Sequence, residues 1–122
     1  MILVDTNIWI DYLRTPSPAL RALLEADVVG THPFVLGELL LGGLARRSDL
    51  ARRLARLPMA TSPTTEEVFA LIERTPLHGT GIGLVDAHLL AATLLTPYSL
   101  LWTRDRRLNA AAEGLRIAYV AS

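Results

Sequence analysis

The sequence predicts an α/β fold in which helices pack against a mainly parallel β-sheet. Two short apolar runs, residues 1–4 and 99–103, lie near opposite ends of the chain and fit buried parallel strands. Between them, apolar residues recur at the three- and four-residue spacing that is typical of helices. Strands near both ends, with helices and short connections between them, favour one layered α/β domain over residues 1–122.

The first quarter of the chain predicts two strands and two helices. The strand over residues 1–4 ends at Asp5, and a helix begins near Thr6. A second helix begins after Ser17, because serine is a favoured helix cap and the proline that follows is favoured at a first helical position. Residues 27–31 form the second candidate strand.

The middle of the chain predicts two more helices. Leucines recur at helical spacing over residues 50–57, and arginines occupy the opposite side. Residues 59–62 form a further candidate strand. Thr64 and Glu67 have the spacing of a capping box, so a helix begins there. The apolar side of that helix is formed by Val68, Phe69 and Ile72.

The last third of the chain predicts the helix at the centre of the core. Residues 85–95 are nearly all apolar, which is typical of a helix buried on all sides. Three glycines within residues 79–83 give it a flexible approach. Asp105 is placed to cap a helix over residues 106–112, and residues 116–120 form the last candidate strand.

The composition excludes several classes of site and location. The 122 residues include no cysteine, which excludes disulfides, thiolate metal sites and cysteine nucleophiles. No apolar run approaches the roughly 18 residues of a membrane span, and the N-terminus lacks the basic segment of a signal peptide. We therefore expect a soluble, cytoplasmic protein without membrane contact. The formal net charge of zero excludes a generally basic nucleic-acid coat but permits a local patch.

Four acidic residues stand in apolar surroundings: Asp5, Glu38, Asp86 and Asp105. Asp5 and Asp105 each follow a candidate strand, and ligands of open parallel sheets bind beyond the carboxyl ends of the strands. Glu38 lies inside a helix and has apolar neighbours three and four residues away. We therefore expect its carboxylate to be buried, and a buried carboxylate needs a metal or a cationic partner.

Helix capping is an alternative interpretation for three of these acids. Asp5 and Asp105 precede helices, and aspartate is favoured at the N-cap. Asp86 falls in the first turn of a helix, where its charge complements the helix dipole. Glu38 has no such explanation, because it lies within its helix.

Convergence of the four acids calls for a cation. Carboxylates that are brought together repel one another strongly where the dielectric constant is low, and a divalent cation is their natural complement. A set of oxygen ligands without a histidine or cysteine motif favours Mg²⁺ or Mn²⁺ over Zn²⁺.

The segments around the four acids resemble the acidic motifs of PIN-domain ribonucleases. They are Val4-Asp5-Thr6-Asn7, Gly37-Glu38-Leu39, Leu84-Val85-Asp86-Ala87 and Trp102-Thr103-Arg104-Asp105. The acids occur in the order of the family, at intervals of 33, 48 and 19 residues. A chain of this length resembles the VapC toxins of bacterial toxin-antitoxin pairs.

The resemblance implies a single PIN-like domain over residues 1–122, with three α/β/α layers and magnesium-dependent endoribonuclease activity in which Mn²⁺ can replace Mg²⁺. It implies that Asp5 and Asp86 are the principal metal ligands, and that Glu38 and Asp105 complete the catalytic cluster directly or through water. The supporting hydrogen bonds are assigned to Thr6, Asn7 and Thr103. In this chemistry a metal-activated water attacks phosphorus, so no nucleophilic side chain is required.

Arginines are the candidates for RNA contact. Arg104 and Arg106 flank Asp105, and guanidinium groups bind phosphate well. A second arginine cluster, within residues 46–56, is interpreted either as an RNA contact or as a solvated helix face. The three histidines, at positions 32, 78 and 88, are expected to have surface or packing roles.

The implied partners are an RNA substrate, a cognate antitoxin protein and a second copy of the chain. Because 51% of this short chain is apolar, part of its surface is expected to be covered by a partner. We expect a homodimer, and an antitoxin bound in an apolar groove beside a helix over residues 39–44.

Three other functions share some of these sequence features. A phosphoacceptor receiver domain needs an acidic pair after its first strand and a lysine after its last core strand, and the chain has neither. A catalytically inactive PIN-like binding module and a metal-dependent nuclease acting on DNA stay open. The sequence does not show whether the acids catalyse a reaction. It also contains no motif that recognises the 2′-hydroxyl of RNA, so the preference for RNA over DNA follows from the resemblance alone.

Overall fold

The structure, a computed structural model, describes residues 1–43 and 45–121. Its strands form one parallel sheet in the order β2-β1-β3. The central strand is β1 (Ile2–Val4), and it pairs with β2 (Val29–Gly30) on one side and β3 (Leu100–Trp102) on the other. All carboxyl ends of the strands therefore face the same edge of the sheet.

Seven helices occur in the part of the chain that the structure describes. They are α1 (Thr6–Arg14), α2 (Pro18–Glu25), α3 (Pro33–Leu41), α4 (Ala45–Leu54), α5 (Thr65–Arg74), α6 (Leu84–Leu95) and α7 (Arg106–Gly114). Among them, none has the length and apolar character needed to cross a membrane.

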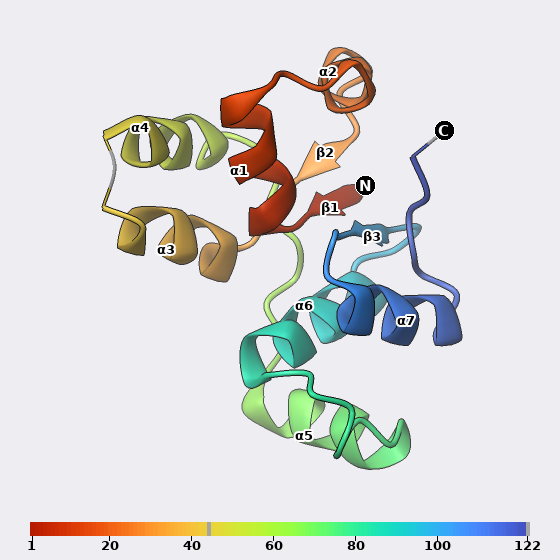
Figure 1. Ribbon diagram of the computed structural model, residues 1–122. Helices are drawn as coiled ribbons and strands as arrows, with labels where there is room; N and C mark the ends of the chain where they lie inside the picture. The colour runs from red at the N-terminus through yellow and green to blue at the C-terminus, as the bar shows by residue number, and fades with distance from the viewer. Residues whose placement is uncertain (44, 122) are drawn as a thin grey trace.

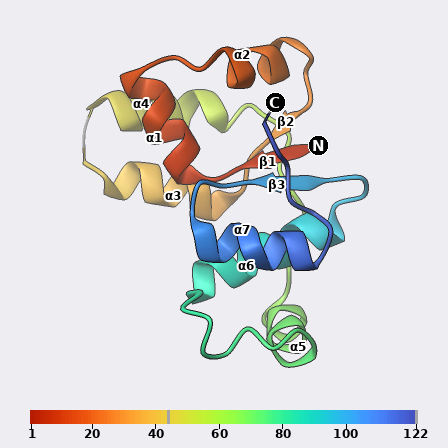
Figure 2. The same cartoon turned by 45° about the vertical axis from the view of Figure 1, so that its right-hand side comes forward.

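The helices cover both faces of the sheet. In Figure 1, α1 and α2 lie above the strands, and α6 and α7 lie below them. Figure 2 shows the same layers after the turn, with α5 on the far side of α6 from the sheet. The helix α3 packs against α1 and α4. This arrangement confirms the predicted three-layer α/β/α fold with a parallel sheet.

Local signals in the sequence place the helix starts correctly. The Ser17 side chain accepts a hydrogen bond from the Leu20 amide and caps α2, with Pro18 in the first turn. At the start of α5, Thr64 and Glu67 form both hydrogen bonds of a capping box. These caps satisfy amide groups that the first turn of a helix leaves free.

Two candidate strands are reduced to single bridges. Within 59–62, only Met59 bridges to Thr31, and Pro63 follows directly. Proline lacks an amide proton, which discourages further ladder pairing. Within 116–120, only Ala118 bridges, and Arg116, the first residue of the segment, has a positive φ of 61°, which lies outside the strand conformation.

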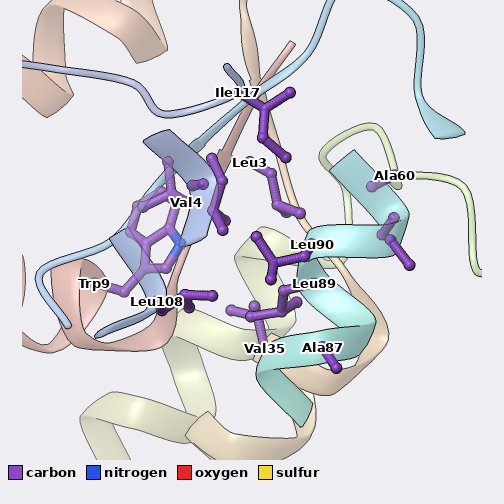
Figure 3. Close-up of a cluster of buried hydrophobic side chains, with 14 of the residues drawn as sticks. Leu3, Val4, Trp9, Val35, Ala60, Ala87, Leu89, Leu90, Leu108 and Ile117 are labelled. Carbon is purple, nitrogen blue, oxygen red and sulfur yellow. The ribbon is translucent and has the colours of Figure 1, made fainter. Parts of the chain in front are cut away.

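The core forms where α6 packs beneath the sheet. Buried side chains from the strands, from α6 and from neighbouring helices meet there, as Figure 3 shows with Leu3, Val4, Trp9, Val35, Leu89, Leu90 and Leu108. The middle of α6 buries six residues, as predicted for a central helix, but Val85, Leu94 and Leu95 at the two ends of the predicted range 85–95 are exposed. Phe69 of α5, by contrast, was expected on the apolar side and is 52% exposed. Val68 and Leu71 take the buried positions, and a step of one residue turns about 100° around a helix.

Two side chains anchor α3 in the core. Of its apolar residues, only Val35 and Leu39 are fully buried, while Leu40 and Leu41 are exposed. The half-buried Leu36 and the packing against α4 and α1 add to this anchor.

We expect Leu39→Ala to lower the free energy of unfolding by about 2–5 kcal/mol, because it removes one of the two buried anchors of α3. Its control is Leu41→Ala, which changes a residue that is 88% exposed and should alter stability by about 0.5 kcal/mol or less. Urea denaturation followed by circular dichroism measures both. Equal effects of the two substitutions would contradict this packing.

Candidate active site

Asp5 stands at the carboxyl end of the central strand and begins α1. Its side chain is buried, and Oδ1 accepts a hydrogen bond from the Thr6 amide at 2.7 Å, which caps the helix. Burial raises the pKa of Asp5, hydrogen bonds from Thr103 and Thr6 oppose the rise, and the charges of Glu38 and Asp105 add to it. A buried carboxylate with acidic neighbours is thus present at the predicted place.

The Thr103 hydroxyl connects the ends of the two strands β1 and β3. It donates a hydrogen bond to Asp5 Oδ2 at 2.7 Å and accepts one from the Asp105 amide at 3.1 Å. The Asn7 side chain donates to the same hydroxyl at 3.3 Å, and its Oδ1 accepts from the Arg104 amide at 3.1 Å. The predicted supporting residues therefore form a network that fixes the loop after β3 against α1.

Glu38 differs from the prediction, because its side chain is exposed rather than buried. Its apolar neighbours Phe34 and Leu41 are exposed as well, since α3 packs through the other side. The residues that flank Glu38 in the sequence are apolar, but the folded chain leaves Glu38 in contact with solvent. The Thr6 hydroxyl nevertheless donates a hydrogen bond to Glu38 Oε1 at 2.8 Å, which joins α3 to the start of α1.

Asp86 lies half-buried in the first turn of α6. Burial is the main cause that raises its pKa to about 6, and the charges of Asp5, Asp105 and Glu38 raise it further, in that order. A hydrogen bond from the Gly83 backbone lowers it. Asp86 is therefore close enough to all three other acids to sense their charges.

Asp105 is exposed and caps α7, since its Oδ1 accepts a hydrogen bond from the Leu108 amide at 2.9 Å. The capping interpretation is thus correct for Asp5 and Asp105, and Asp86 has its predicted place in a first turn. Asp5, Asp86 and Asp105 lie at the starts of α1, α6 and α7, and these helix starts are close together. The positions that place the acids at helix starts therefore also cluster them. The partial positive charge of three helix N-termini offsets part of the repulsion among the acids.

Three of the candidate RNA-binding arginines contact other parts of the protein. The Arg104 guanidinium pairs with Asp11 of α1 at 2.8 Å, a partner that the sequence analysis missed because Asp11 stands on an ordinary polar helix position. Arg106, in the first turn of α7, is exposed. In α4, Arg46 donates to the Leu13 carbonyl and Arg52 pairs with Asp49. These contacts give part of the 46–56 cluster a structural role.

The acids suit a divalent cation by their chemistry. Four carboxylates and two threonine hydroxyls provide only oxygen donors, which hard cations prefer. Within residues 1–43 and 45–121, no three acidic, histidine or cysteine side chains stand close enough to hold an ion in the arrangement seen. Asp5 and Glu38 instead make hydrogen bonds to the threonines. The four acids are close enough to influence one another's charge, but their side chains are not arranged as a complete set of metal ligands.

Comparison with known proteins identifies the family. The family model of the PIN domain matches residues 2–114. Ribonuclease VapC32, in two strains of Mycobacterium tuberculosis, is 45% identical over 111 residues, which are 91% of this chain and 90% of that protein. The chain belongs to the PIN domain family and, within it, to the VapC-type ribonucleases, so it is an enzyme that hydrolyses phosphodiester bonds.

A solved structure has the same fold. FitAcB from Neisseria gonorrhoeae superposes with a TM-score of 0.65 at 21% sequence identity, and the match covers 93% of this chain and 94% of that one. At this level of identity the likeness supports the fold alone.

Crowding of the acids predicts a pH-dependent stability. The folded chain holds a proton on Asp86 up to a pH of about 6, whereas the free side chain loses it near 3.8. Because the pKa is raised in the folded state, the contribution of Asp86 to stability is present at low pH and is lost as the pH rises through this window.

We therefore expect Asp86→Asn to melt at a higher temperature than wild type in chelating buffer near neutral pH, with the difference shrinking toward a pH of about 4. The control Asp49→Asn removes an exposed carboxylate paired with Arg52 and should not raise the melting temperature. Differential scanning calorimetry across this pH range measures the effect. A lower melting point for Asp86→Asn near neutral pH would show that Asp86 acts only as a helix-dipole partner.

Proposed function

We propose that this protein is a magnesium-dependent endoribonuclease and the toxin of a toxin-antitoxin pair. The observation that carries the proposal is the half-buried carboxylate of Asp86, which senses three other acids at the carboxyl edge of a parallel sheet in a PIN-domain chain. The relative in Mycobacterium tuberculosis, named a ribonuclease, supports RNA as the substrate.

Asp5 and Asp86 are the residues that would hold the cation, and Glu38 and Asp105 would complete its surroundings directly or through water. When bound, a divalent cation lowers the pKa of a water ligand and neutralises charge on the phosphate. Mg²⁺ is proposed first, with Mn²⁺ as its replacement, because both take oxygen ligands.

The hydrogen bonds of the chain would orient these carboxylates. The Thr6 amide donates to one oxygen of Asp5 and Thr103 donates to the other, so a cation would bind Asp5 through the remaining lone pairs of oxygens whose direction is fixed. The Thr6 hydroxyl holds one oxygen of Glu38, and the other oxygen would face the ligand. Asn7 in turn steadies Thr103. Such second contacts typically decide how well a carboxylate binds its metal.

Arg106 is the residue proposed to bind RNA phosphate beside the acids. It is exposed in the first turn of α7, next to Asp105. Arg104 is proposed for the same role by its position, but its guanidinium is paired with Asp11. Arg104 therefore contributes to RNA binding mainly by fixing the loop after β3, because part of its guanidinium is already bound to Asp11.

We expect Asp5→Asn and Asp86→Asn to lose nearly all turnover while remaining folded, because an amide keeps the shape but not the charge of a metal ligand. Cleavage of a labelled single-stranded RNA, with Mg²⁺ or with chelator, measures this. The control Asp49→Asn should cleave like wild type. Full activity in chelator or in either variant would contradict the metal site, while preferred cleavage of the matching DNA strand would favour the DNA nuclease. Absence of any cleavage by wild type would favour the inactive binding module.

Metal binding is also expected without turnover. At ten times its dissociation constant, Mg²⁺ should stabilise the folded state by roughly 1.4 kcal/mol. For a domain of this size, that corresponds to a rise in melting temperature on the order of 4 to 7 °C. Asp86→Asn should lose most of the rise, and a full rise in this variant would exclude Asp86 as a ligand.

An antitoxin and a second copy of the chain are the proposed partners. The helix α3 ends at Leu41, and its exposed Leu40 and Leu41 offer an apolar surface for the antitoxin. Leu44, the end of the groove expected from the sequence, lies outside the described residues. The homodimer is proposed on the apolar composition alone.

The partners can be tested separately. We expect a dimer by light scattering at micromolar concentration, and a strictly monomeric protein would refute the homodimer. Expression of the wild-type chain should be toxic and Asp86→Asn should relieve the toxicity. Harmless expression of an active wild-type enzyme would contradict the toxin assignment.

A further inference from the structure

An aromatic contact joins the two helices that carry Glu38 and Asp86. The ring of Phe34, in the first turn of α3, lies 4.9 Å from the ring of His88 in α6, with the ring planes tilted by 54°. Phe34 precedes Glu38 by four residues, about one helical turn, and His88 follows Asp86 by two residues. The contact thus joins the same two helices as the Glu38–Asp86 charge interaction, although the step of two residues turns His88 about 200° around α6 from Asp86.

Neighbouring groups restrict both rings. The buried His32 lies edge-on to the Phe34 ring at 5.1 Å, and its Nδ1 accepts a hydrogen bond from the Phe34 amide at 3.0 Å, which fixes the start of α3. On the other helix, the His88 ring places Nδ1 2.8 Å from the Leu84 carbonyl oxygen. The pair therefore has less conformational freedom to lose when a ligand binds.

Burial does not explain why a phenylalanine occupies this position. Phe34 is 40% exposed although it is apolar, and the imidazole rings of His32 and His88 lie beside it. An exposed ring beside a phosphodiesterase site offers a flat π-face where an RNA strand has to pass. Unstacked RNA bases bind to such faces of phenylalanine and histidine.

We propose that Phe34 and His88 form a stacking platform for one nucleobase of the RNA, beside the phosphate that is cleaved. This inference depends on the proposed ribonuclease function and adds a subsite to it. The platform would bind bases through their π-faces, so it would favour single-stranded RNA over paired RNA without selecting one base strictly.

A second copy of the chain is the competing occupant, because Leu84 of α6 is exposed beside His88. A protein partner seated on Phe34, either a second copy or the antitoxin proposed for α3, would compete with RNA for this surface. It would depend on apolar area, which leucine supplies as well as phenylalanine does. A base depends on the ring itself, and this difference separates the two occupants.

The test compares Phe34→Leu, which keeps an apolar side chain, with Phe34→Tyr, which keeps the ring. Binding of a fluorescently labelled single-stranded RNA is measured by polarisation in chelator. We expect Phe34→Leu to weaken binding by at least about fivefold, the lower range of base-aromatic stacking. Phe34→Tyr should bind close to wild type. In Mg²⁺, Phe34→Leu should raise KM more than it lowers kcat, as expected for lost substrate binding.

The only other phenylalanine of the chain provides a matched control. Phe69 is similarly exposed, but it lies on α5, which carries none of the four acids, so Phe69→Leu should bind RNA like wild type. His88→Leu tests the platform from the other helix and should weaken binding in the same direction. It keeps the inference testable if a substitution at Phe34 disturbs the fold.

The outcomes separate the inference from the function beneath it. If wild type cleaves RNA and both Phe34→Leu and His88→Leu bind RNA like wild type, the platform is wrong and the nuclease stands. If Phe34→Ala, which removes the apolar area as well as the ring, changes the oligomeric state by light scattering, the side chain belongs to a contact between copies and the platform is likewise wrong. If wild type neither binds nor cleaves RNA, the proposed function and the platform fail together.

Discussion

The parallel pairing of β1 with β3 is the constraint on which the candidate site depends. Their register places Val4 opposite Trp102, and the Asp5 amide donates a hydrogen bond to the Trp102 carbonyl at 2.9 Å. The residues that follow the two strands therefore meet although 98 positions separate Asp5 from Thr103 in the chain. Because the sheet is buried between helices on both faces, this edge is where polar side chains of both strands can reach a ligand.

Two acids of the candidate site also cap helices that the fold requires. Helices α1 and α7 begin at the edge of the sheet and need caps for their free amide groups, and Asp5 and Asp105 supply them. Capping fixes one oxygen of each carboxylate and leaves the rest of the acid at the edge. Asp86 differs, because no side chain caps α6 and its carboxylate has little to offset burial beyond the Gly83 backbone. Asp86 thus combines burial, few compensating hydrogen bonds and the charges of all three other acids.

The sequence predicts the features that depend on residues close together in the chain. The strand ends, the helix caps at Ser17 and Thr64, and the buried helix α6 follow from spacing and from the residue types that favour caps. The burial of Glu38 was mispredicted, because a run of apolar neighbours does not reveal which side of α3 packs. The Asp11–Arg104 pair and the Phe34–His88 contact were not foreseen either. Both connect distant elements through ordinary residue types, and only the tertiary packing brings them together.

Electrostatic repulsion and hydrogen bonding together explain why the acids approach one another without closing on a common point. Each carboxylate that moved toward its neighbours would increase repulsion in a partly buried setting, where charges interact strongly. Hydrogen bonds from Thr6 and Thr103 instead hold Glu38 and Asp5 at their present positions. These same bonds are short and specific, so a cation would meet carboxylates whose directions are already restricted and would have only the remaining repulsion to remove. The exposed state of Glu38 and Asp105 fits this balance, because solvent screens the charges of both acids.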